Sequence, residues 1–259
     1  LKNNWIIRLL ERIEYFLYAN AQHIVAAVPG IRTDLIRRGF SPDKISLIPN
    51  GVDLDMFHPH SDIEALRTQY RLQDHFVVSY IGTHGMAHAL DKVMLAADRL
   101  RNQKILFLFI GEGAEKEKLI RIKEKMRLDH VRFIGRQPRA RIPLFIAASD
   151  ACLVSLSSTD FFSYALPSKL FEFMACGRPI ILSTKGAFGQ LIENAQCGIG
   201  VEPEQPEALA EAILKLYGDP ILATQLGRNG RKYVVAHMDR RKFAIQYEQV
   251  LKKVVSSAP

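Results

Sequence analysis

Continuous apolar runs recur along the middle of the chain, and most are followed by a stretch with helical spacing. Six of these runs have the length of strands, and they are residues 75–82, 105–111, 131–135, 150–156, 179–183 and 198–203. Their apolar positions are mostly consecutive rather than alternating, which indicates strands covered on both faces. Repeated strand–helix units of this kind predict an α/β fold with a doubly wound parallel sheet and right-handed crossovers.

The two ends of the chain follow a different pattern. The first fifty residues read as helix 4–19, strand 22–28, helix 29–39 and strand 44–51. So short a series buries too little apolar surface to fold by itself. We therefore expect residues 1–48 to be the end of a preceding domain, 49–74 a linker and entry helix, 75–238 the ligand-binding domain, and 239–259 a C-terminal helix that packs back toward the first segment.

Composition narrows the class of protein. The chain has 259 residues, 48% of them hydrophobic, and a formal net charge of +8. Lysine and arginine are spread along the chain without a zinc-knuckle, RNP or helix–turn–helix motif, so nucleic acid is not an expected partner. No apolar stretch of the sequence approaches the ~20 residues of a spanning helix. The three cysteines do not have the spacing of metal ligands, and so few of them favour reduced thiols in a cytosolic protein over a set of disulfides. The chain starts with leucine, which suggests that it is part of a longer protein.

The loop after the strand at 75–82 has the features of a phosphate site. A doubly wound sheet binds ligands beyond the carboxyl ends of its strands. In GTHGMAHALD, residues 82–91, Gly82 and Gly85 would let the backbone approach a ligand closely. His84 and His88 could add hydrogen bonds or charge. The alternative is an ordinary turn with two surface histidines, and a metal site is not expected because no third ligand is apparent nearby.

Two further loops follow strands. GEG at 111–113 lacks the third glycine of the dinucleotide fingerprint, so we interpret it as turn chemistry and do not expect a nicotinamide dehydrogenase. In FIGRQPRARI, residues 133–142, Gly135 ends a strand and Arg136 follows at its tip. Arg136 could hold a diphosphate or stack on a base, or it could belong to a solvated arginine cluster.

The segment ALPSKLFEFMACGRPIIL, residues 165–182, predicts a helix that begins near Pro167 and leads into a strand. Ser168, Lys169 and Glu172 fall near one face of this helix, opposite its apolar stripe. Glu172 could accept both hydroxyls of a ribose while Lys169 lies near phosphates. Lys169 and Glu172 could equally be a solvated pair three residues apart on a surface helix.

Taken in order, these loops resemble the C-terminal part of the family 4, or group 1, glycosyltransferases of the GT-B fold. The resemblance rests on IPNGVDLDMF, YIGTHGMAHALD, GEG, FIG, PSKLFEFMACGRPII and TKGAFGQLIENAQCGIGV, and it covers nearly the whole chain. The sequences GTHGMAHALD and PSKLFEFMA look most like those of enzymes that make bacterial surface polysaccharide, including fucosamine-transferase-like O-antigen enzymes. The opening segment then resembles the end of an N-terminal acceptor domain.

The resemblance implies roles for particular residues. Glu172 occupies the second acidic position of the family's E-x7-E motif, which implies ribose binding, while the first falls on Tyr164. Tyr164, or nearby Asp160, would then take the place of a carboxylate that contacts the transferred sugar.

The phosphate and base positions also follow from the resemblance. The family's usual phosphate-binding Arg and Lys fall on Thr83 and His88, and Lys169 could restore the missing charge. Backbone N–H groups of Ser168 and Lys169 match those expected at the β-phosphate, and Gly135 and Arg136 lie where the base is expected.

The function that the resemblance implies is a retaining glycosyltransferase. The donor would be a nucleotide diphosphate sugar, UDP-linked, and no cofactor or metal is expected. The acceptor would be a lipid-linked or other glycan of O-antigen or capsule synthesis, met in the cytoplasm at the inner face of the membrane, with an anionic bilayer surface as a candidate partner of residues 1–48. This chain alone is expected to lack turnover. A sugar-nucleotide 2-epimerase of the same fold and a non-catalytic nucleotide-sugar-binding fragment are the alternatives.

Overall fold

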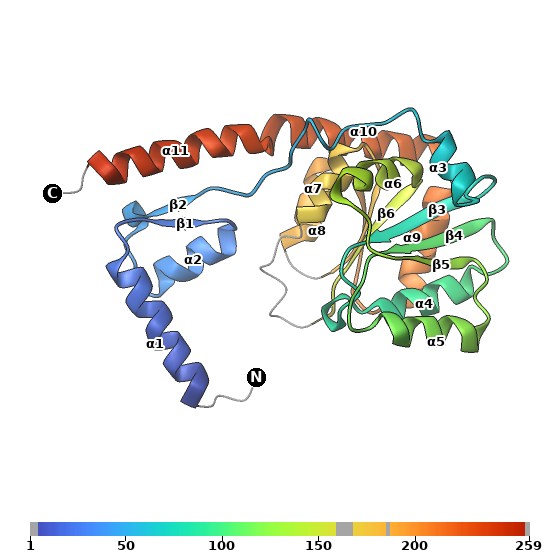
Figure 1. The fold of residues 1–259 in the computed structure, drawn as a ribbon, viewed down its shortest axis with the longest axis horizontal. Coiled ribbons are helices and arrows are strands. Elements are labelled where there is room, and N and C mark those ends of the chain that lie inside the picture. The colour runs from blue at the N-terminus through green and yellow to red at the C-terminus, as the bar shows by residue number, and fades with distance from the viewer. Residues whose placement is uncertain (1–4, 159–167, 185–186, 257–259) are drawn as a thin grey trace. The chain divides into compact units, whose positions relative to one another are not determined.

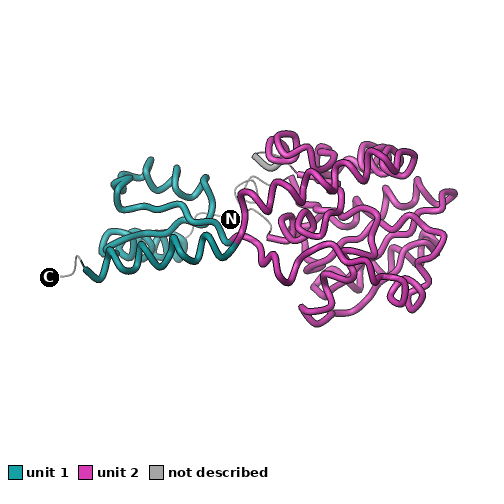
Figure 2. Tube along the Cα trace, turned by 90° about the horizontal axis from the view of Figure 1, so that it is seen from above, with its two compact units in different colours: residues 1–50, 240–259 teal, residues 51–239 magenta. Residues whose placement is uncertain are grey.

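The computed structural model describes residues 5–158, 168–184 and 187–256 of the chain. These residues form two compact units, which are described separately here (Figure 2). One unit comprises residues 1–50 and 240–259, and the other comprises residues 51–239. The two units therefore meet in the sequence after Asn50 and after Asp239. The assignment of residues 1–48, 49–74, 75–238 and 239–259 to domains of a longer protein stays a prediction.

The larger unit is built on a six-stranded sheet in the order β5-β4-β3-β6-β7-β8, with every neighbouring pair parallel (Figure 1). Its strands are β3 (Phe76–Ile81), β4 (Ile105–Ile110), β5 (Val131–Ile134), β6 (Ala151–Ser155), β7 (Ile180–Ser183) and β8 (Gly198–Val201). The change of strand order beside β3 is the mark of a doubly wound sheet. The predicted fold class and all six predicted strands are confirmed.

Helices cover both faces of this sheet. They are α3 (Glu64–Gln69), α4 (Leu90–Arg99), α5 (Lys116–Met126), α6 (Ile142–Ala148), α7 (Ser168–Ala175), α8 (Ala187–Ala195), α9 (Pro206–Gly218) and α10 (Pro220–His237), with short 3-10 turns η2 (Met86–His88) and η3 (Arg139–Arg141). In Figure 1, α4 and α5 lie on one face, and α6 and α7 lie on the other. Successive strand residues point to opposite faces, so β3 sends Val78 and Tyr80 into the core with α4 and α9, and sends Ser79 toward Ser149.

The smaller unit consists of α1 (Trp5–Asn20), β1 (Ile24–Ala26), α2 (Pro29–Arg37), the 3-10 turn η1 (Pro42–Lys44), β2 (Ile45–Leu47) and α11 (Arg240–Ser256). The strands β1 and β2 pair in parallel, and a few residues around Leu35 and Phe40 form a small core. The helix α1 buries none of its residues, and Trp5 on it is 73% exposed. This unit therefore has far less buried apolar surface than the larger one.

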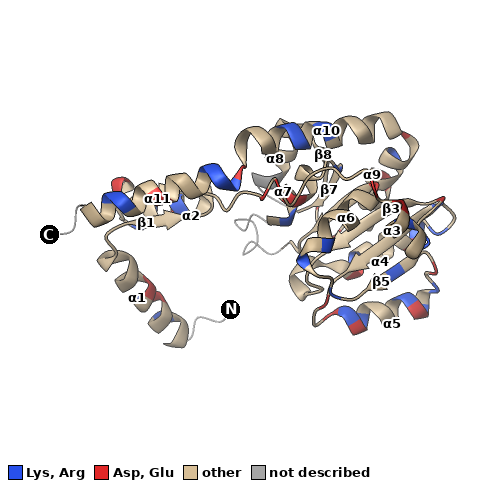
Figure 3. Ribbon diagram, turned by 45° about the horizontal axis from the view of Figure 1, so that its top comes forward, with Lys and Arg blue, Asp and Glu red and all other residues tan. Residues whose placement is uncertain are grey.

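The positive charge is distributed over helix surfaces (Figure 3). On α5, lysine and arginine alternate with glutamate, and α10 and α11 carry further basic residues. A mixed surface of this kind is ordinary for solvated helices. Within the described residues, each helix is too short or too polar to traverse a bilayer.

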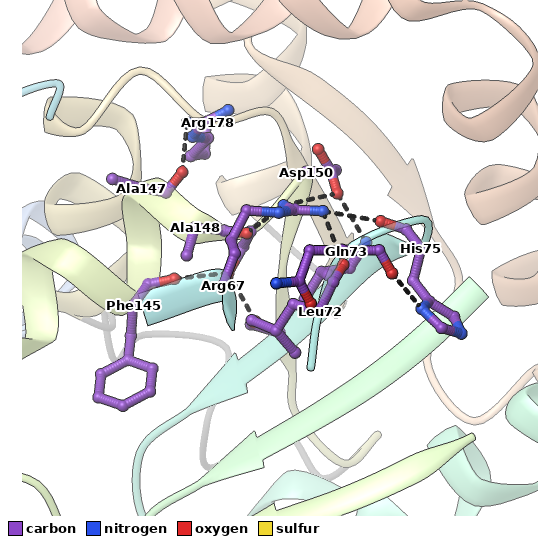
Figure 4. Close-up of polar contacts among 12 residues, drawn as sticks. Arg67, Leu72, Gln73, His75, Phe145, Ala147, Ala148, Asp150 and Arg178 are labelled. Atoms are coloured by element: carbon purple, nitrogen blue, oxygen red, sulfur yellow. Dashed lines mark hydrogen bonds and ion pairs between the residues drawn. The ribbon is translucent and has the colours of Figure 1, made fainter. Parts of the chain in front are cut away.

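A half-buried arginine, Arg67, ties the loops at the amino ends of β3 and β6 together (Figure 4). Arg67 of α3 donates to the carbonyl oxygens of Ala148 (2.7 Å), Leu72 (3.0 Å) and His75 (2.9 Å). Asp150 accepts from the backbone N–H of Val77 at 2.7 Å and faces Arg67 at 3.5 Å. Because each of these groups would be unpaired without the others, the network fixes the sheet at the edge opposite its carboxyl ends.

Candidate functional site

The loops after β3 and β4 pack against each other through their backbones at the carboxyl edge of the sheet. The N–H of His84 donates to the carbonyl of Glu112 at 2.8 Å, and the carbonyl of His84 accepts from Glu115 N–H at 2.9 Å. A Cβ added to Gly111, whose φ is +139°, would collide with the carbonyl of Gly82. The GEG segment, interpreted from the sequence as turn chemistry, is therefore the partner that lets the glycine loop close up.

Lys169 reaches this loop from α7. Its Nζ lies 3.2 Å from the position that a Cβ on Gly82 would occupy. The ammonium donates to the Tyr80 hydroxyl at 3.2 Å and lies 4.2 Å from the centroid of the Tyr80 ring. The Tyr80 hydroxyl in turn donates to the carbonyl of Thr83 at 2.7 Å. Residues 89 positions apart in the sequence are thus brought together, and α7 is placed beside the loop after β3 as its predicted role requires.

The ammonium of Lys169 is poorly solvated. Burial lowers the pKa of Lys169 to about 8, and the Glu172 carboxylate acts in the opposite direction. At neutral pH the side chain is therefore still mostly charged, while its pKa lies more than two units below that of a solvated lysine. A poorly solvated cation held by the ring and hydroxyl of Tyr80 would gain from a bound anion, because the anion would add favourable charge to that of Glu172.

Glu172 does not face bulk solvent. Its side chain is 14% exposed, and its carboxylate accepts from Arg139 of η3 at 3.2 Å. Arg139 lies over the Phe57 ring, with its guanidinium carbon 5.4 Å from the ring centroid. Such burial is well beyond that of a solvated helix pair, so the surface-pair interpretation of Lys169 and Glu172 does not describe these side chains.

His84 corrects one expectation from the sequence. Its side chain is fully buried, with its ring against those of Tyr80, Phe109 and Phe133 at centroid distances of 5.8 to 6.2 Å. Burial lowers the pKa of His84 to about 4, so the ring is neutral at physiological pH. The interpretation of His84 as a surface histidine is wrong, because its backbone bonds to the GEG loop turn the ring inward.

His88 is half-buried and is fixed by the end of β6. Its Nδ1 lies 3.2 Å from the carbonyl oxygen of Ser155, which can only accept, so Nδ1 carries the proton. Burial and the nearby Lys169 both lower the pKa of His88. The neutral ring then leaves Nε2 as an acceptor, which suits a hydroxyl group of a ligand better than a phosphate oxygen.

Gly135 and Arg136 lie beside Glu112. The Arg136 backbone N–H donates to Glu112 Oε1 at 3.3 Å, and that carboxylate also pairs with Lys116 at 2.7 Å. Lys116 lowers the pKa of Glu112, so the carboxylate is charged at neutral pH. The Arg136 side chain is exposed and has no ion-pair partner among the described residues. The loops after β3, β4 and β5 thus adjoin one another, and α7 adds Lys169 and Glu172.

The remaining predicted positions are placed only in part. Ser168 is exposed and is the first described residue of α7. Gly85 is half-buried and precedes η2. Tyr164 and Asp160 lie outside the described residues. In the part of the chain that the structure describes, no three His, Cys, Asp or Glu side chains gather as a metal site would require.

Three residues of this site were not selected from the sequence, and they are Tyr80, Glu112 and Arg139. Tyr80 reads as one more apolar position of a buried strand, although a tyrosine next to the strand end is a usable signal because its hydroxyl needs a partner. Arg139 stands three positions after Arg136 in the same arginine-rich loop, and only the tertiary contact with Glu172 distinguishes the two.

Comparisons with known proteins place the chain in a family. The profile of the family described as glycosyl transferases group 1 matches residues 62–233, and that of glycosyltransferase family 4 matches residues 1–56. WcaI of Escherichia coli K12, named as a glycosyl transferase of colanic acid biosynthesis, is 26% identical over 234 residues, which is 88% of this chain and 56% of WcaI. WbjE of Pseudomonas aeruginosa, named as a glycosyltransferase, is 26% identical over 82% of this chain and 54% of its own length.

Solved structures give the same fold. Anabaena HepE, crystallised with UDP and glucose, superimposes with a TM-score of 0.81 at 20% identity, covering 91% of this chain and 64% of HepE. Sucrose-phosphate synthase from Thermosynechococcus elongatus superimposes with a TM-score of 0.81 at 26% identity, covering 95% of this chain and 62% of the synthase. The chain spans about half the length of the curated relatives it matches. Its fold is that of GT-B glycosyltransferases, and the chain belongs to the group 1 glycosyl transferases.

Proposed function

We propose that this chain carries the nucleotide-sugar donor site of a retaining glycosyltransferase that acts in surface polysaccharide synthesis. The observation that carries the proposal is the approach of the Lys169 ammonium to the loop at Gly82, with Glu172 one turn further along the same helix. A diphosphate between the Gly82 loop and the start of α7 would meet that ammonium, and its ribose would meet Glu172. The naming of WcaI and the UDP complexes of HepE support this choice of chemistry.

The proposed chemistry is the departure of a nucleotide diphosphate from the anomeric carbon of the sugar. Negative charge builds on the phosphate oxygens as that bond breaks, and groups held ready to meet this charge lower the barrier. Lys169 is such a group, because the Tyr80 ring and hydroxyl hold its ammonium in place before any ligand binds. The backbone N–H groups of Ser168 and Lys169 would add to it. In this proposal the reaction proceeds without a bound metal.

The other residues would hold the ends of the donor. Gly135 and Arg136 would meet the base, with Glu112 fixing the Arg136 backbone. The neutral His88 would accept from a hydroxyl of the sugar through Nε2, and Tyr164 would stand where the family has its first carboxylate. Arg139 would position the Glu172 carboxylate. The acceptor, a lipid-linked or other glycan, would be met by the parent protein at the cytoplasmic face of the membrane.

The test measures UDP binding by calorimetry in the chain and in two variants. Glu172→Gln keeps the shape of the side chain but weakens its hydrogen bonds to ribose hydroxyls, so we expect UDP affinity to fall about tenfold or more. Glu211→Gln, at an exposed glutamate on α9, is the matched control and should bind UDP as the unmodified chain does. Equal affinities in all three proteins would refute the assignment of Glu172 to ribose.

A further inference from the structure

A second concave site lies at the opposite edge of the sheet. A cleft of about 710 Å³ is lined by residues at the amino ends of three neighbouring strands. Phe76 begins β3, Asp150 directly precedes β6, and Pro179 directly precedes β7. The site at Gly82 and Lys169 lies beyond the carboxyl ends of the same sheet. The cleft is therefore separate from the proposed donor site.

The cleft carries an excess of positive charge. Four basic side chains line it, and they are Arg178, Arg228, Arg231 and Lys232. Asp150 is the acidic side chain of the lining, and it is already engaged by Val77 N–H and by Arg67 (Figure 4). Among the described residues, none of the four basic side chains forms an ion pair. Their charge is thus uncompensated, which is costly for cations gathered in one concavity.

Two of the four cations are held rigidly. Arg231 donates from Nη1 to the carbonyl oxygens of Phe57 at 3.1 Å and Ala175 at 3.0 Å. Arg178 donates from Nη2 to the carbonyl of Ala147, while its Nε is buried without a partner in the described part of the chain. A buried N–H donor without an acceptor is rare in proteins, and a bound water or ion is one way in which it is satisfied. The guanidinium groups are therefore fixed before a ligand arrives.

Backbone contact also fixes the wall of the cleft. A Cβ added to Gly227 of α10 would collide with the carbonyl of Gly177, the residue just before Arg178. The helix that carries Arg228, Arg231 and Lys232 thus packs directly against the turn that carries Arg178. The backbone of the two walls is therefore held in place before a ligand binds.

We propose that this cleft binds a phosphate-bearing ligand. Guanidinium groups match phosphate oxygens with paired N–H donors, and a dianion would balance charge that the protein leaves uncompensated. The rest of the lining includes Pro59, Pro179, Pro220 and Ala223, which would contact an uncharged part of the ligand. The phosphate could belong to a soluble phosphorylated compound or to the headgroup of an anionic lipid.

The test follows backbone amide resonances of the chain while inorganic phosphate is added at constant ionic strength. We expect saturable shifts at Gly177, Arg178 and the second half of α10, and the resonances of Gly82 and Lys169 report separately on the proposed donor site. Arg228→Gln combined with Lys232→Gln removes two exposed charges from α10, so the fold should persist and phosphate affinity at the cleft should fall about tenfold. Arg121→Gln combined with Lys125→Gln removes two exposed charges from α5 and should change nothing at the cleft.

A second arm identifies the source of the phosphate. Vesicles of phosphatidylglycerol and phosphatidylcholine are sedimented with the chain and with both double variants, and phosphatidylcholine vesicles alone serve as the blank. Binding to the anionic vesicles that the α10 variant loses and the α5 variant keeps indicates a lipid headgroup. Saturable phosphate shifts without vesicle binding indicate a soluble ligand. Absence of saturable shifts at Gly177 and α10, or shifts unchanged in the α10 variant, overturns the proposal.

Discussion

Replacing Lys169 by methionine should change stability and donor binding in opposite directions. Methionine keeps an unbranched side chain of similar length and removes the charge. The pKa of Lys169 is lowered from 10.5 to about 8 by burial, so holding the ammonium in the folded protein costs about 3 kcal/mol at pH 7. The Lys169→Met chain should therefore be more stable than the unmodified chain at pH 7, by up to that amount.

The sign of the effect sets its pH dependence. The penalty is complete where the lysine is protonated in both the folded and the unfolded chain, which is below the folded pKa of about 8. It disappears as the pH rises toward the unfolded value of 10.5, because the unfolded chain then loses the same proton. The stability gain from Lys169→Met should accordingly shrink above pH 8. Urea unfolding at a series of pH values measures it.

Donor binding should respond in the other direction. Loss of a charge-assisted hydrogen bond costs about 1.5–3 kcal/mol, so UDP affinity should fall about ten- to a hundredfold in calorimetry. Lys215→Met, at an exposed lysine on α9, is the control and should leave stability within about 0.5 kcal/mol and UDP affinity unchanged. A Lys169→Met chain that is destabilised at pH 7 and still binds UDP normally would show that the lysine is structural, and the reasoning would fail.

Two further outcomes follow from the same contacts. UDP affinity of the unmodified chain should decline as the pH rises through about 8, because Lys169 of the free chain loses its proton there, whereas a bound diphosphate would keep Lys169 protonated. Calorimetry should find no such decline in the Lys169→Met chain. An affinity of the unmodified chain that does not change with pH would contradict this reasoning. Asp150→Ala removes the acceptor of Val77 N–H and the charge facing Arg67. Urea unfolding should therefore show a free energy of unfolding lower by about 2–3 kcal/mol, while UDP affinity stays unchanged. An unaltered free energy of unfolding would mean that water replaces the carboxylate at no cost.

The sequence predicts the sheet well because its signal is local. The inner strands β3, β4, β6 and β7 are buried on both faces, so their apolar residues are consecutive and their ends are marked by glycine or by polar residues. The positions of Lys169 and Glu172 near one helix face follow from helical geometry in the same way. Parallel sheet topology then brings the loops after β3, β4 and β5 to one edge, as the sequence analysis assumes.

The contacts that distinguish one loop residue from its neighbours could not be predicted in this way. Arg139 and Glu172 are 33 positions apart and meet only because α6 and β6 carry the chain from one to the other. The sequence favours Arg136 over Arg139 because Arg136 is nearer the strand end. His84 is a second example, because a polar residue in a glycine loop is predicted to be exposed, whereas its backbone hydrogen bonds to the loop after β4 turn its ring into the core.

The backbone contact between Gly111 and Gly82 limits how the proposed donor site can be changed by substitution. A surface made of main-chain atoms keeps its shape whatever side chains surround it, and any larger residue at position 111 would force the loops after β3 and β4 apart. Substitutions that alter the proposed site without moving the loops would then fall on the groups around that contact, such as those at positions 112, 136 and 139. In the proposed donor site, the architecture thus separates a main-chain platform for the charged portion of a substrate from a periphery whose side chains can be exchanged.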